Sequence, residues 1–478
     1  MIRRTPPSLV LATLGLCGLQ LSAVSASPAQ SAAHLQPAVS PQDAELREVR
    51  GTRVLVRLPP GFSPATSFAG FQDPERGLAL MVSELSAPFE VVSAGFEDGG
   101  TLEGQGMKVL RRRTHRNGRY PGLLLEVEQR TKAGDFYKWI WLFGSQEECV
   151  IVLGACALDQ GETHTDLLKA LVLSSAWDAE RTVDRDSALV FELGDTGGME
   201  RVEVVSGALG YMPPRGPFGG KDRRALFLCA PGMTAVPTDR EAYARARIQQ
   251  TATFSNIEIE SIEPVEVDGL QGYATLATAL DENDGGRSFI YQVLLSEGMT
   301  YWVLSGMGPQ PERAELLPLY RKTASSFRRK REKIASKDGL FEVSVPASWT
   351  LQAGLDEDAS LQVGAPVPAV YLVASSEAKA DLERGLSLRE YSAARREGLE
   401  QQALSVREPV ELQLDGRRAL LAEFDLPLEE MQLHYLHVSV DGREHFHNLL
   451  FWCPRETYSF SRVDITNVLG SLREIRDE

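Results

Sequence analysis

The clearest structural pattern in the sequence is Gly339-Leu-Phe-Glu-Val-Ser-Val-Pro-Ala-Ser-Trp349. Apolar and polar residues alternate from Leu340 to Val345, which predicts a half-buried strand, because successive strand side chains point to opposite faces of a sheet. Pro346 ends the alternation, since proline cannot donate to a strand ladder. This stretch therefore predicts a sheet with one apolar and one polar face at the start of a folded module.

The residues that follow it continue the module. A second strand is expected at Val370–Val373, and the apolar spacing over Leu386–Gln402 predicts an amphipathic helix. Two hairpins follow, turning at Asp415-Gly416 and at Asp441-Gly442, because Asp-Gly pairs accept the positive φ angles of a type I′ turn. A helix at Val463–Glu474 closes the module.

Two earlier stretches follow the same order of events at a spacing of roughly 150 residues, which indicates an internal repeat. In the middle copy, helices are expected at Asp239–Gln250 and Glu312–Phe327, around a turn near Asp268–Gly272. In the first copy, a turn at Asn117-Gly118 precedes a closing helix at Thr165–Trp177. The central helix of the first copy is weak because glycines interrupt it.

These patterns predict an α+β fold of three tandem modules, each an antiparallel sheet backed by two helices. The expected modules are residues 44–178, 185–328 and 336–478. Turns at matching positions support the repeat, and the same residues, Glu263-Pro-Val-Glu266 and Glu408-Pro-Val-Glu411, stand just before two of these turns. The repeat itself is therefore the main architectural prediction.

The first residues predict a secretory signal peptide over residues 1–26. Arg3 and Arg4 precede an apolar run from Leu9 to Leu21, and Val24-Ser-Ala26 offers small residues for cleavage. Lipid attachment at Cys17 is disfavoured, because Leu16 stands where a small residue is required. Residues 27–43 form a disordered spacer by composition. The protein is thus expected to be exported, to the periplasm or outside the cell, with no transmembrane segment after cleavage.

The charge of the chain restricts its partners. The formal net charge is −16, and loss of Arg3 and Arg4 with the signal peptide would bring it to −18. A surface of this sign repels nucleic acid and anionic lipid as partners of the whole molecule. A protein partner is the expectation, and nucleic acid is excluded.

The order of elements in the third copy is similar to the PsbP and DcrB type of module. The resemblance rests on Gly339–Trp349, Leu386–Gln402, Gly416, Tyr435–Phe451 and the final helix. It implies an antiparallel sheet backed by helices, usually in a non-catalytic accessory or binding protein. It assigns no ligand residue.

Four of the seven histidines lie between His434 and His447. If Asp441-Gly442 is a two-residue turn, His434, His445 and His447 share one face of the hairpin, and His437 points the other way. His445-x-His447 with His434 could then form a metal site. The alternative is that these are core or half-exposed histidines, because no Asp or Glu was found to complete a site.

A basic cluster is the second candidate site. Arg111, Arg112, Arg113, Arg116 and Arg119 precede or occupy a predicted turn. The cluster could bind an acidic polymer, a lipid headgroup or an acidic partner. The alternative is ordinary surface charge on an exposed hairpin.

Other chemistry is weakly represented. Cys149, Cys156, Cys229 and Cys453 are expected to be buried free thiols, since the first two share one predicted strand and the others lie in separate modules. The loop Arg215–Lys221 departs from the phosphate-loop pattern, and Asp281–Gly286 lacks the calcium-loop pattern. No cofactor is predicted.

These observations favour an exported, non-enzymatic binding or accessory protein of the cell envelope. Repetition without a recognisable catalytic motif is typical of extended contact surfaces. Two alternatives stay open: a metal-dependent or other hydrolase with a site in the third module, and a structural envelope protein.

Overall fold

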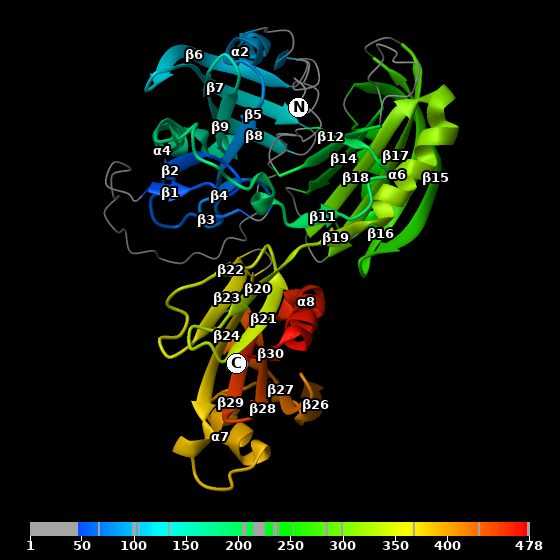
Figure 1. Ribbon diagram of the computed structural model, residues 1–478. Coiled ribbons are helices and arrows are strands. Elements are labelled where there is room, and N and C mark those ends of the chain that lie inside the picture. The colour runs from blue at the N-terminus through cyan, green and yellow to red at the C-terminus, as the bar shows by residue number, and fades with distance from the viewer. Residues whose placement is uncertain are drawn as a thin grey trace. The chain divides into compact units, whose positions relative to one another are not determined.

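The computed structural model describes residues 46–475 apart from 66, 98–101, 104–105, 132–133, 203–206, 214–224, 233–236, 238, 252, 283–284, 298–299, 367–368 and 429–430. The predicted signal peptide, the spacer and the loop Arg215–Lys221 lie outside these residues, as does part of Asp281–Gly286. The chain divides into two compact units, one ending at Arg328 and the other beginning at Arg329 (Figure 1). Each unit is described by itself.

The first large sheet has seven antiparallel strands in the order β3-β4-β5-β9-β8-β7-β6. Its strands are β3 (Ser63–Pro64), β4 (Gly70–Asp73), β5 (Leu78–Leu85), β6 (Met107–Asn117), β7 (Tyr120–Thr131), β8 (Gly134–Gly144) and β9 (Cys149–Ala157). Three short strands, β1 (Leu46–Glu48), β2 (Val54–Arg57) and β10 (Ala176–Trp177), form a separate small sheet. The helical segments are α2 (Phe89–Glu97), a 3-10 turn at Leu158–Gln160 and α4 (Gly161–Leu173).

The second large sheet repeats this order as β12-β13-β14-β18-β17-β16-β15. Its strands are β12 (Glu200–Val202), β13 (Leu209–Met212), β14 (Leu226–Pro231), β15 (Phe254–Val267), β16 (Leu270–Asp281), β17 (Arg287–Glu297) and β18 (Thr300–Pro309). β11 (Phe191–Leu193) pairs with β19 (Phe327–Arg329). The helical segments are α5 (Arg240–Gln249), α6 (Arg313–Ser325) and 3-10 turns at Arg185–Ala188 and Gln310–Glu312.

The third large sheet has the order β22-β23-β24-β29-β28-β27-β25, and β26 also pairs with β27. Its strands are β22 (Thr350–Leu351), β23 (Leu361–Pro366), β24 (Ala369–Ala378), β25 (Ser405–Val406), β26 (Val410–Leu414), β27 (Arg417–Leu428), β28 (Met431–Asp441) and β29 (His445–Pro454). β20 (Arg331–Ala335), β21 (Phe341–Pro346) and β30 (Arg473–Glu474) form its small companion sheet. The helical segments are 3-10 turns at Lys379–Asp381 and Arg455–Thr457, α7 (Leu388–Glu400) and α8 (Tyr458–Ser471).

The predicted α+β class is wrong. Strands hold 52% of the described residues and helices 23%, so the described part of the protein is mostly antiparallel sheet. The sequence hides part of this strand content because bulges break the alternation of apolar and polar residues. In the 14-residue strand β15, the pairing with β16 slips between Ser255 and Glu258 and again between Ile259 and Ser261. The boundaries 44–178, 185–328 and 336–478 stay a prediction.

The two Asp-Gly turns of the third sheet behave differently. Leu414 pairs with Arg417, and Asp415 and Gly416 have φ angles of 51° and 71°, so the predicted two-residue turn is confirmed. The predicted turn at Asp441-Gly442 is wrong, because Asp441 pairs with Phe446. Lys379 Nζ donates to Asp441 Oδ1 and to the Gly442 carbonyl at 2.6 Å, which holds a longer loop in place.

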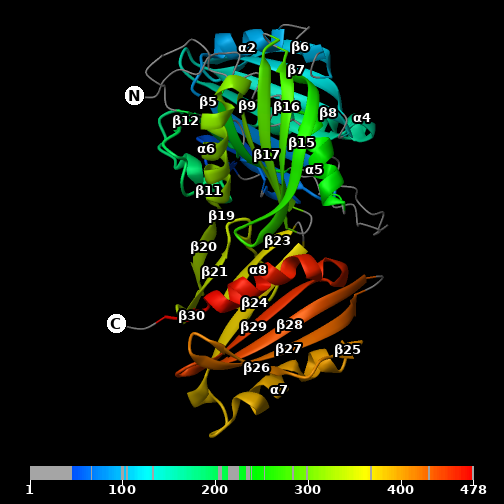
Figure 2. The ribbon, with the colours of Figure 1, turned by 90° about the vertical axis from the view of Figure 1, so that its right-hand side faces the viewer.

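Apolar residues on both faces of the third sheet are covered by helices (Figure 2). Ile465, Val468 and Leu469 of α8 pack into the main core, which also contains Phe341 of β21. On the other face, Leu388 and Tyr391 of α7 pack against Leu420 and Phe446. α7 begins at Ser387, whose hydroxyl accepts from the Glu390 backbone N–H while the Glu390 carboxylate accepts from the Ser387 N–H. Among the described residues, no helix is long and apolar enough to cross a bilayer.

Two glycines of this unit predict opposite stability changes. Gly416 has φ of 71° and Gly398 lies inside α7, and a Cβ added at either would meet open space. Gly416→Ala should lower the free energy of unfolding by about 1 to 2 kcal/mol, because alanine is strained at positive φ. Gly398→Ala should raise it by about 1 kcal/mol through helix propensity. Urea denaturation measures both, and two changes of the same sign would contradict the assigned conformations.

Candidate interaction surface

The predicted histidine face forms with a different register. In the pairing of β28 with β29, His434 lies opposite Cys453 and His447 lies opposite Val440. A two-residue turn at Asp441-Gly442 would instead set His434 opposite Leu449 and His447 opposite Leu436, so the register is shifted by four residues. Because four is an even number, His434 and His447 still lie on the face that carries the main core. His437 lies opposite Leu450, on the face covered by α7.

His434 is only 1% exposed and is held by an acidic neighbour. Its Nδ1 lies 2.7 Å from Asp425 Oδ1, and its ring packs on Tyr458 with centroids 3.8 Å apart. Asp425 also accepts a hydrogen bond from Ser405 at 2.8 Å and lies 3.2 Å from Arg455 Nε. Burial acts to raise the pKa of Asp425, but the bonds from His434 and Ser405 hold it below its ordinary value.

His447 occupies a separate buried position. Its Nδ1 lies 2.9 Å from Ser376 Oγ, and its Nε2 lies 3.6 Å from Glu474 Oε1. Burial lowers the pKa of the His447 imidazole. His445 is half-buried, and its ring centroid lies 6.4 Å from that of His447.

The three candidate metal ligands are not brought together. His434 is level with Cys453, six residues along the strand from His447, which corresponds to about 20 Å. Within the part of the chain that the structure describes, no group of three or more His, Cys, Asp or Glu side chains could hold a metal ion. Two carboxylates that the sequence reasoning missed lie beside these histidines instead: Asp425 hydrogen-bonds His434, and Glu474 lies 3.6 Å from His447. Asp425 lies directly opposite His434 in the β27–β28 pairing, a relation that becomes visible once that register is known.

The cysteines do not supply a nucleophile. Cys149, Cys156, Cys229 and Cys453 are free and all buried, so their predicted burial is confirmed. Burial raises the pKa of Cys156 to about 12 and that of Cys453 to about 11. The thiolate is the reactive form, so these groups are inert at neutral pH.

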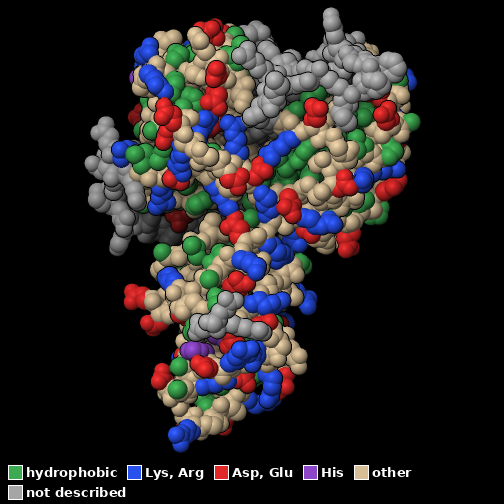
Figure 3. All heavy atoms as spheres, in the orientation of Figure 1, with side chains coloured by type: hydrophobic (Ala, Val, Ile, Leu, Met, Phe, Trp, Pro, Cys, Tyr) green, Lys and Arg blue, Asp and Glu red, His purple; other side chains and the backbone are tan. Residues whose placement is uncertain are grey.

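The predicted basic cluster lies on β6, the last strand of the first sheet. Among the described residues β6 pairs with β7 alone, so one side of its backbone has no neighbouring strand from that part of the chain. The side chains from Leu110 to Arg116 are all exposed. Lys and Arg side chains stand at the edge of the first unit over this strand (Figure 3). β6 thus combines an open strand edge with a dense positive charge.

The arginines of β6 are divided between the two faces of the sheet. Arg111 lies opposite Glu126 and forms a 3.3 Å ion pair with it, on the face covered by α4. Arg113 lies on the same face, opposite Leu124. Arg112 points to the face of α2, where its Nη2 donates to the Phe96 carbonyl at 2.7 Å.

Much of this charge is left without an acidic partner. Arg116 Nη2 donates to the Arg119 carbonyl at 2.7 Å, and Arg119 donates to the Tyr120 hydroxyl at 2.9 Å. No carboxylate of the described residues forms an ion pair with Arg112, Arg113 or Arg116. The structure therefore brings all five predicted basic residues onto one hairpin, β6 and its turn, and leaves several guanidinium groups open to an external anion.

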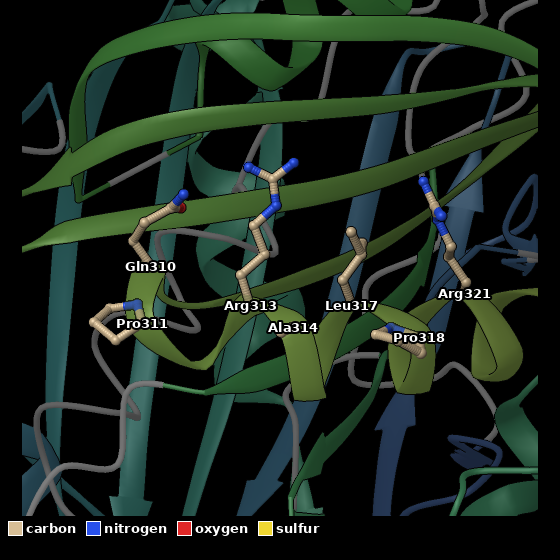
Figure 4. A pocket seen from close by; sticks show the side chains of 7 residues that line it. All are labelled: Gln310, Pro311, Arg313, Ala314, Leu317, Pro318 and Arg321. Atoms are coloured by element: carbon tan, nitrogen blue, oxygen red, sulfur yellow. The ribbon is translucent and has the colours of Figure 1, made fainter.

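A shallow hollow lies beside α6 in the second sheet (Figure 4). Its lining comes from one continuous stretch, residues 310–321. Arg313 and Arg321 are the charged side chains there, but both oxygens of Glu260 on β15 already bind Arg313 at 2.8 and 2.6 Å. A hollow walled by one helix, with one of its two cations neutralised, offers less to an anion than β6 does.

No protein-family model and no curated protein matches the sequence. Among solved structures, the chain is similar to cyanobacterial PsbP from Synechocystis, at 9% identity over 30% of this chain and 92% of that chain, with a TM-score of 0.25. It is similar to LpqN of Mycobacterium tuberculosis, described as involved in cell envelope biogenesis, at 10% identity over 31% and 91%, with a TM-score of 0.25.

The chain is also similar to the immunity protein TplEi of Pseudomonas aeruginosa, at 13% identity over 61% of this chain and 99% of that chain, with a TM-score of 0.22. It spans 49% of the length of a similar structure from Bacteroides thetaiotaomicron. TM-scores of this size carry no argument about function. The resemblance to the PsbP and DcrB type of module stands as a weak likeness of architecture.

His437 predicts a pH-dependent loss of stability. Burial, together with Arg396 and Arg395, lowers the pKa of His437 to about 4. The unfolded chain takes up this proton near pH 6.5 and the folded chain near pH 4, so the contribution of His437 to stability is present above pH 6.5 and is lost as pH falls toward 4.

Replacing His437→Leu should remove up to about 3 kcal/mol of this pH dependence of the unfolding free energy. Chemical denaturation at pH 7.0, 5.5 and 4.5 measures the difference between variant and wild type. The control Leu420→Ala, at a buried apolar position on the same face, should destabilise equally at each pH. Parallel pH curves for wild type and His437→Leu would contradict the assignment.

Proposed function

We propose that this chain is an exported, non-enzymatic binding or accessory protein of the cell envelope, and that β6 binds an acidic protein partner. The observation that carries the proposal is the open, arginine-rich edge of the first sheet. An edge strand offers backbone donors and acceptors to an added strand, and its arginines offer paired N–H groups to carboxylates. An extended acidic segment satisfies both.

The chemistry of the partner follows from charge. Guanidinium groups bind carboxylate and phosphate alike, so the local cluster does not separate an acidic protein from nucleic acid. The net charge of −16 on the whole chain favours an acidic protein over nucleic acid. A long polyanion is repelled by the rest of the surface, whereas a short acidic segment contacts only the cluster. Binding of this kind is weakened by salt.

The non-enzymatic part of the proposal is supported by the state of the reactive groups. His434 and His447 are each 1% exposed, with Asp425 bound to the first and Glu474 3.6 Å from the second, and the cysteine thiols are buried. A substrate would have to reach groups that the core encloses. Export is supported by the sequence of residues 1–26, which predicts cleavage after Ala26.

The partner-binding role of β6 can be tested by charge reversal. Arg113→Glu/Arg116→Glu should reduce the yield of the crosslinked partner from the native envelope at least tenfold, since like charges would then face the acidic segment. Arg384→Glu/Arg389→Glu, at two exposed arginines of the other unit, is the matched control and should leave the yield unchanged. Equal yields from both variants would reject β6 as the binding surface.

The predicted export can be tested independently. The mature protein from the producing cell should begin at Ser27, as measured by intact mass and N-terminal sequencing. Ala26→Glu should abolish this cleavage, because a small residue is required at that position, and Ala33→Glu in the spacer should not affect it. A mature chain that still begins at Met1 would contradict the signal peptide.

A further inference from the structure

The second sheet carries an edge strand in the same place as β6. β15 is the last strand in its sheet order and pairs with β16 alone, as β6 pairs with β7 alone. Both strands are long, at 14 and 11 residues, and each follows the central helix of its sheet, α5 or α2. Figures 1 and 2 show both strands at the margin of their sheets. The two edges are therefore equivalent positions of one repeated topology.

The two equivalent edges carry opposite charge. β6 carries Lys108 and four arginines and no acidic residue, whereas β15 carries Glu258, Glu260, Glu263 and Glu266 and no basic residue. Glu260 is bound to Arg313, and Glu266 accepts a hydrogen bond from Gln271. Glu258, Glu263 and Glu266 are exposed and form no ion pair within the described residues.

The charges also match face by face. Glu258 lies opposite Thr278 and Glu263 lies opposite Ala274, both on the face where α6 packs. Glu266 lies opposite Gln271, on the face of α5. α4 follows β9 and α6 follows β18 in the chain, so these two helices are equivalent. α2 precedes β6 and α5 precedes β15, so these two are equivalent as well.

If β6 and β15 of two molecules pair antiparallel, the two sheets are related by an approximate twofold axis normal to the sheet. Such an axis keeps equivalent faces on the same side, so the α4 face continues into the α6 face and the α2 face into the α5 face. That joining puts Arg111 and Arg113 on the same face of the joined sheet as Glu258 and Glu263. It puts Arg112 and Arg116 on the same face as Glu266.

We infer that β6 of one chain pairs antiparallel with β15 of a second copy of this chain, forming a sheet that continues from one molecule into the next. The inference rests on the proposed function, because it names the acidic segment that β6 binds. Since the two joined edges are different surfaces, the contact is heterologous and each molecule keeps one free edge of each kind. Association therefore extends head to tail.

Three features of the two strands make the pairing of β6 with β15 weak. Pro264 has no backbone N–H, so it leaves a gap in any ladder that β15 forms with a new strand. The bulges between Ser255 and Ser261 shorten the regular part of the edge. The ion pairs of this contact are exposed, so each adds little to the affinity and is screened by salt. Reversible assembly at low ionic strength is the expected behaviour.

Sedimentation velocity of the mature chain tests this inference. Wild type should show a concentration-dependent rise in sedimentation coefficient at 50 mM salt, and its apparent dissociation constant should rise at least tenfold at 500 mM salt. Arg111→Glu/Arg113→Glu and Glu258→Arg/Glu263→Arg should each be monomeric alone, because the substituted positions of one edge then carry the same sign of charge as positions 258 and 263, or 111 and 113, of the other edge. An equimolar mixture of the two should associate again, because every β6 then meets a β15 of opposite charge.

The outcomes separate the inference from the proposed function. Wild type that stays monomeric at 50 mM salt, or a mixture that stays monomeric, overturns the pairing of β6 with β15. If wild type is monomeric but Arg113→Glu/Arg116→Glu reduces crosslinking to another envelope protein, the pairing of β6 with β15 is wrong and the proposed binding role of β6 is retained. Association that persists in either single variant also overturns the inference. Circular dichroism and thermal melting of each variant exclude loss of folding as the cause.

Discussion

In each large sheet, the third strand along the chain pairs antiparallel with the last strand, and this pairing fixes where the other strands can lie. It joins β5 to β9, β14 to β18 and β24 to β29. Once these strands are paired, the strands that lie between them in the chain extend the sheet outward from the last strand, and the first of them lies at the edge. The helix after the third strand and the helix after the last strand then cover apolar residues of the sheet, as α7 and α8 do.

The edge position created in this way is used differently in each copy. In the first sheet it carries arginines, and in the second it carries glutamates. In the third sheet, two short strands, β25 and β26, share it, with the exposed side chains Val406 and Val410. Charge and short length are the usual means of preventing uncontrolled edge pairing. Opposite charge on equivalent edges also makes selective pairing possible. The candidate interaction surface is therefore the edge strand, whose side chains differ between the three sheets while the strand order is repeated.

Local signals predicted the parts of this molecule that local physics controls. Asp415-Gly416 marks a turn because both residues adopt positive φ, and the helix after Ser387 begins where its capping box requires. Asp441-Gly442 carries the same dipeptide but forms a longer loop, which is bound by Lys379 of the distant 3-10 turn Lys379–Asp381. The α+β class failed for a related reason: bulges in strands such as β15 interrupt the alternation from which strand length is inferred.

Composition and neighbours along the chain were enough to predict the repeated order of elements, the amphipathic strands, the cluster of arginines near Asn117 and the burial of the cysteines. The fold was needed to show that β6 and β15 are edges, that His434 binds Asp425 and that His447 lies beside Glu474. These relations join residues through strand order and register, which depend on the pairing of distant strands. A strand at an edge and a strand at the centre can have similar local sequences, so their exposure is fixed by topology.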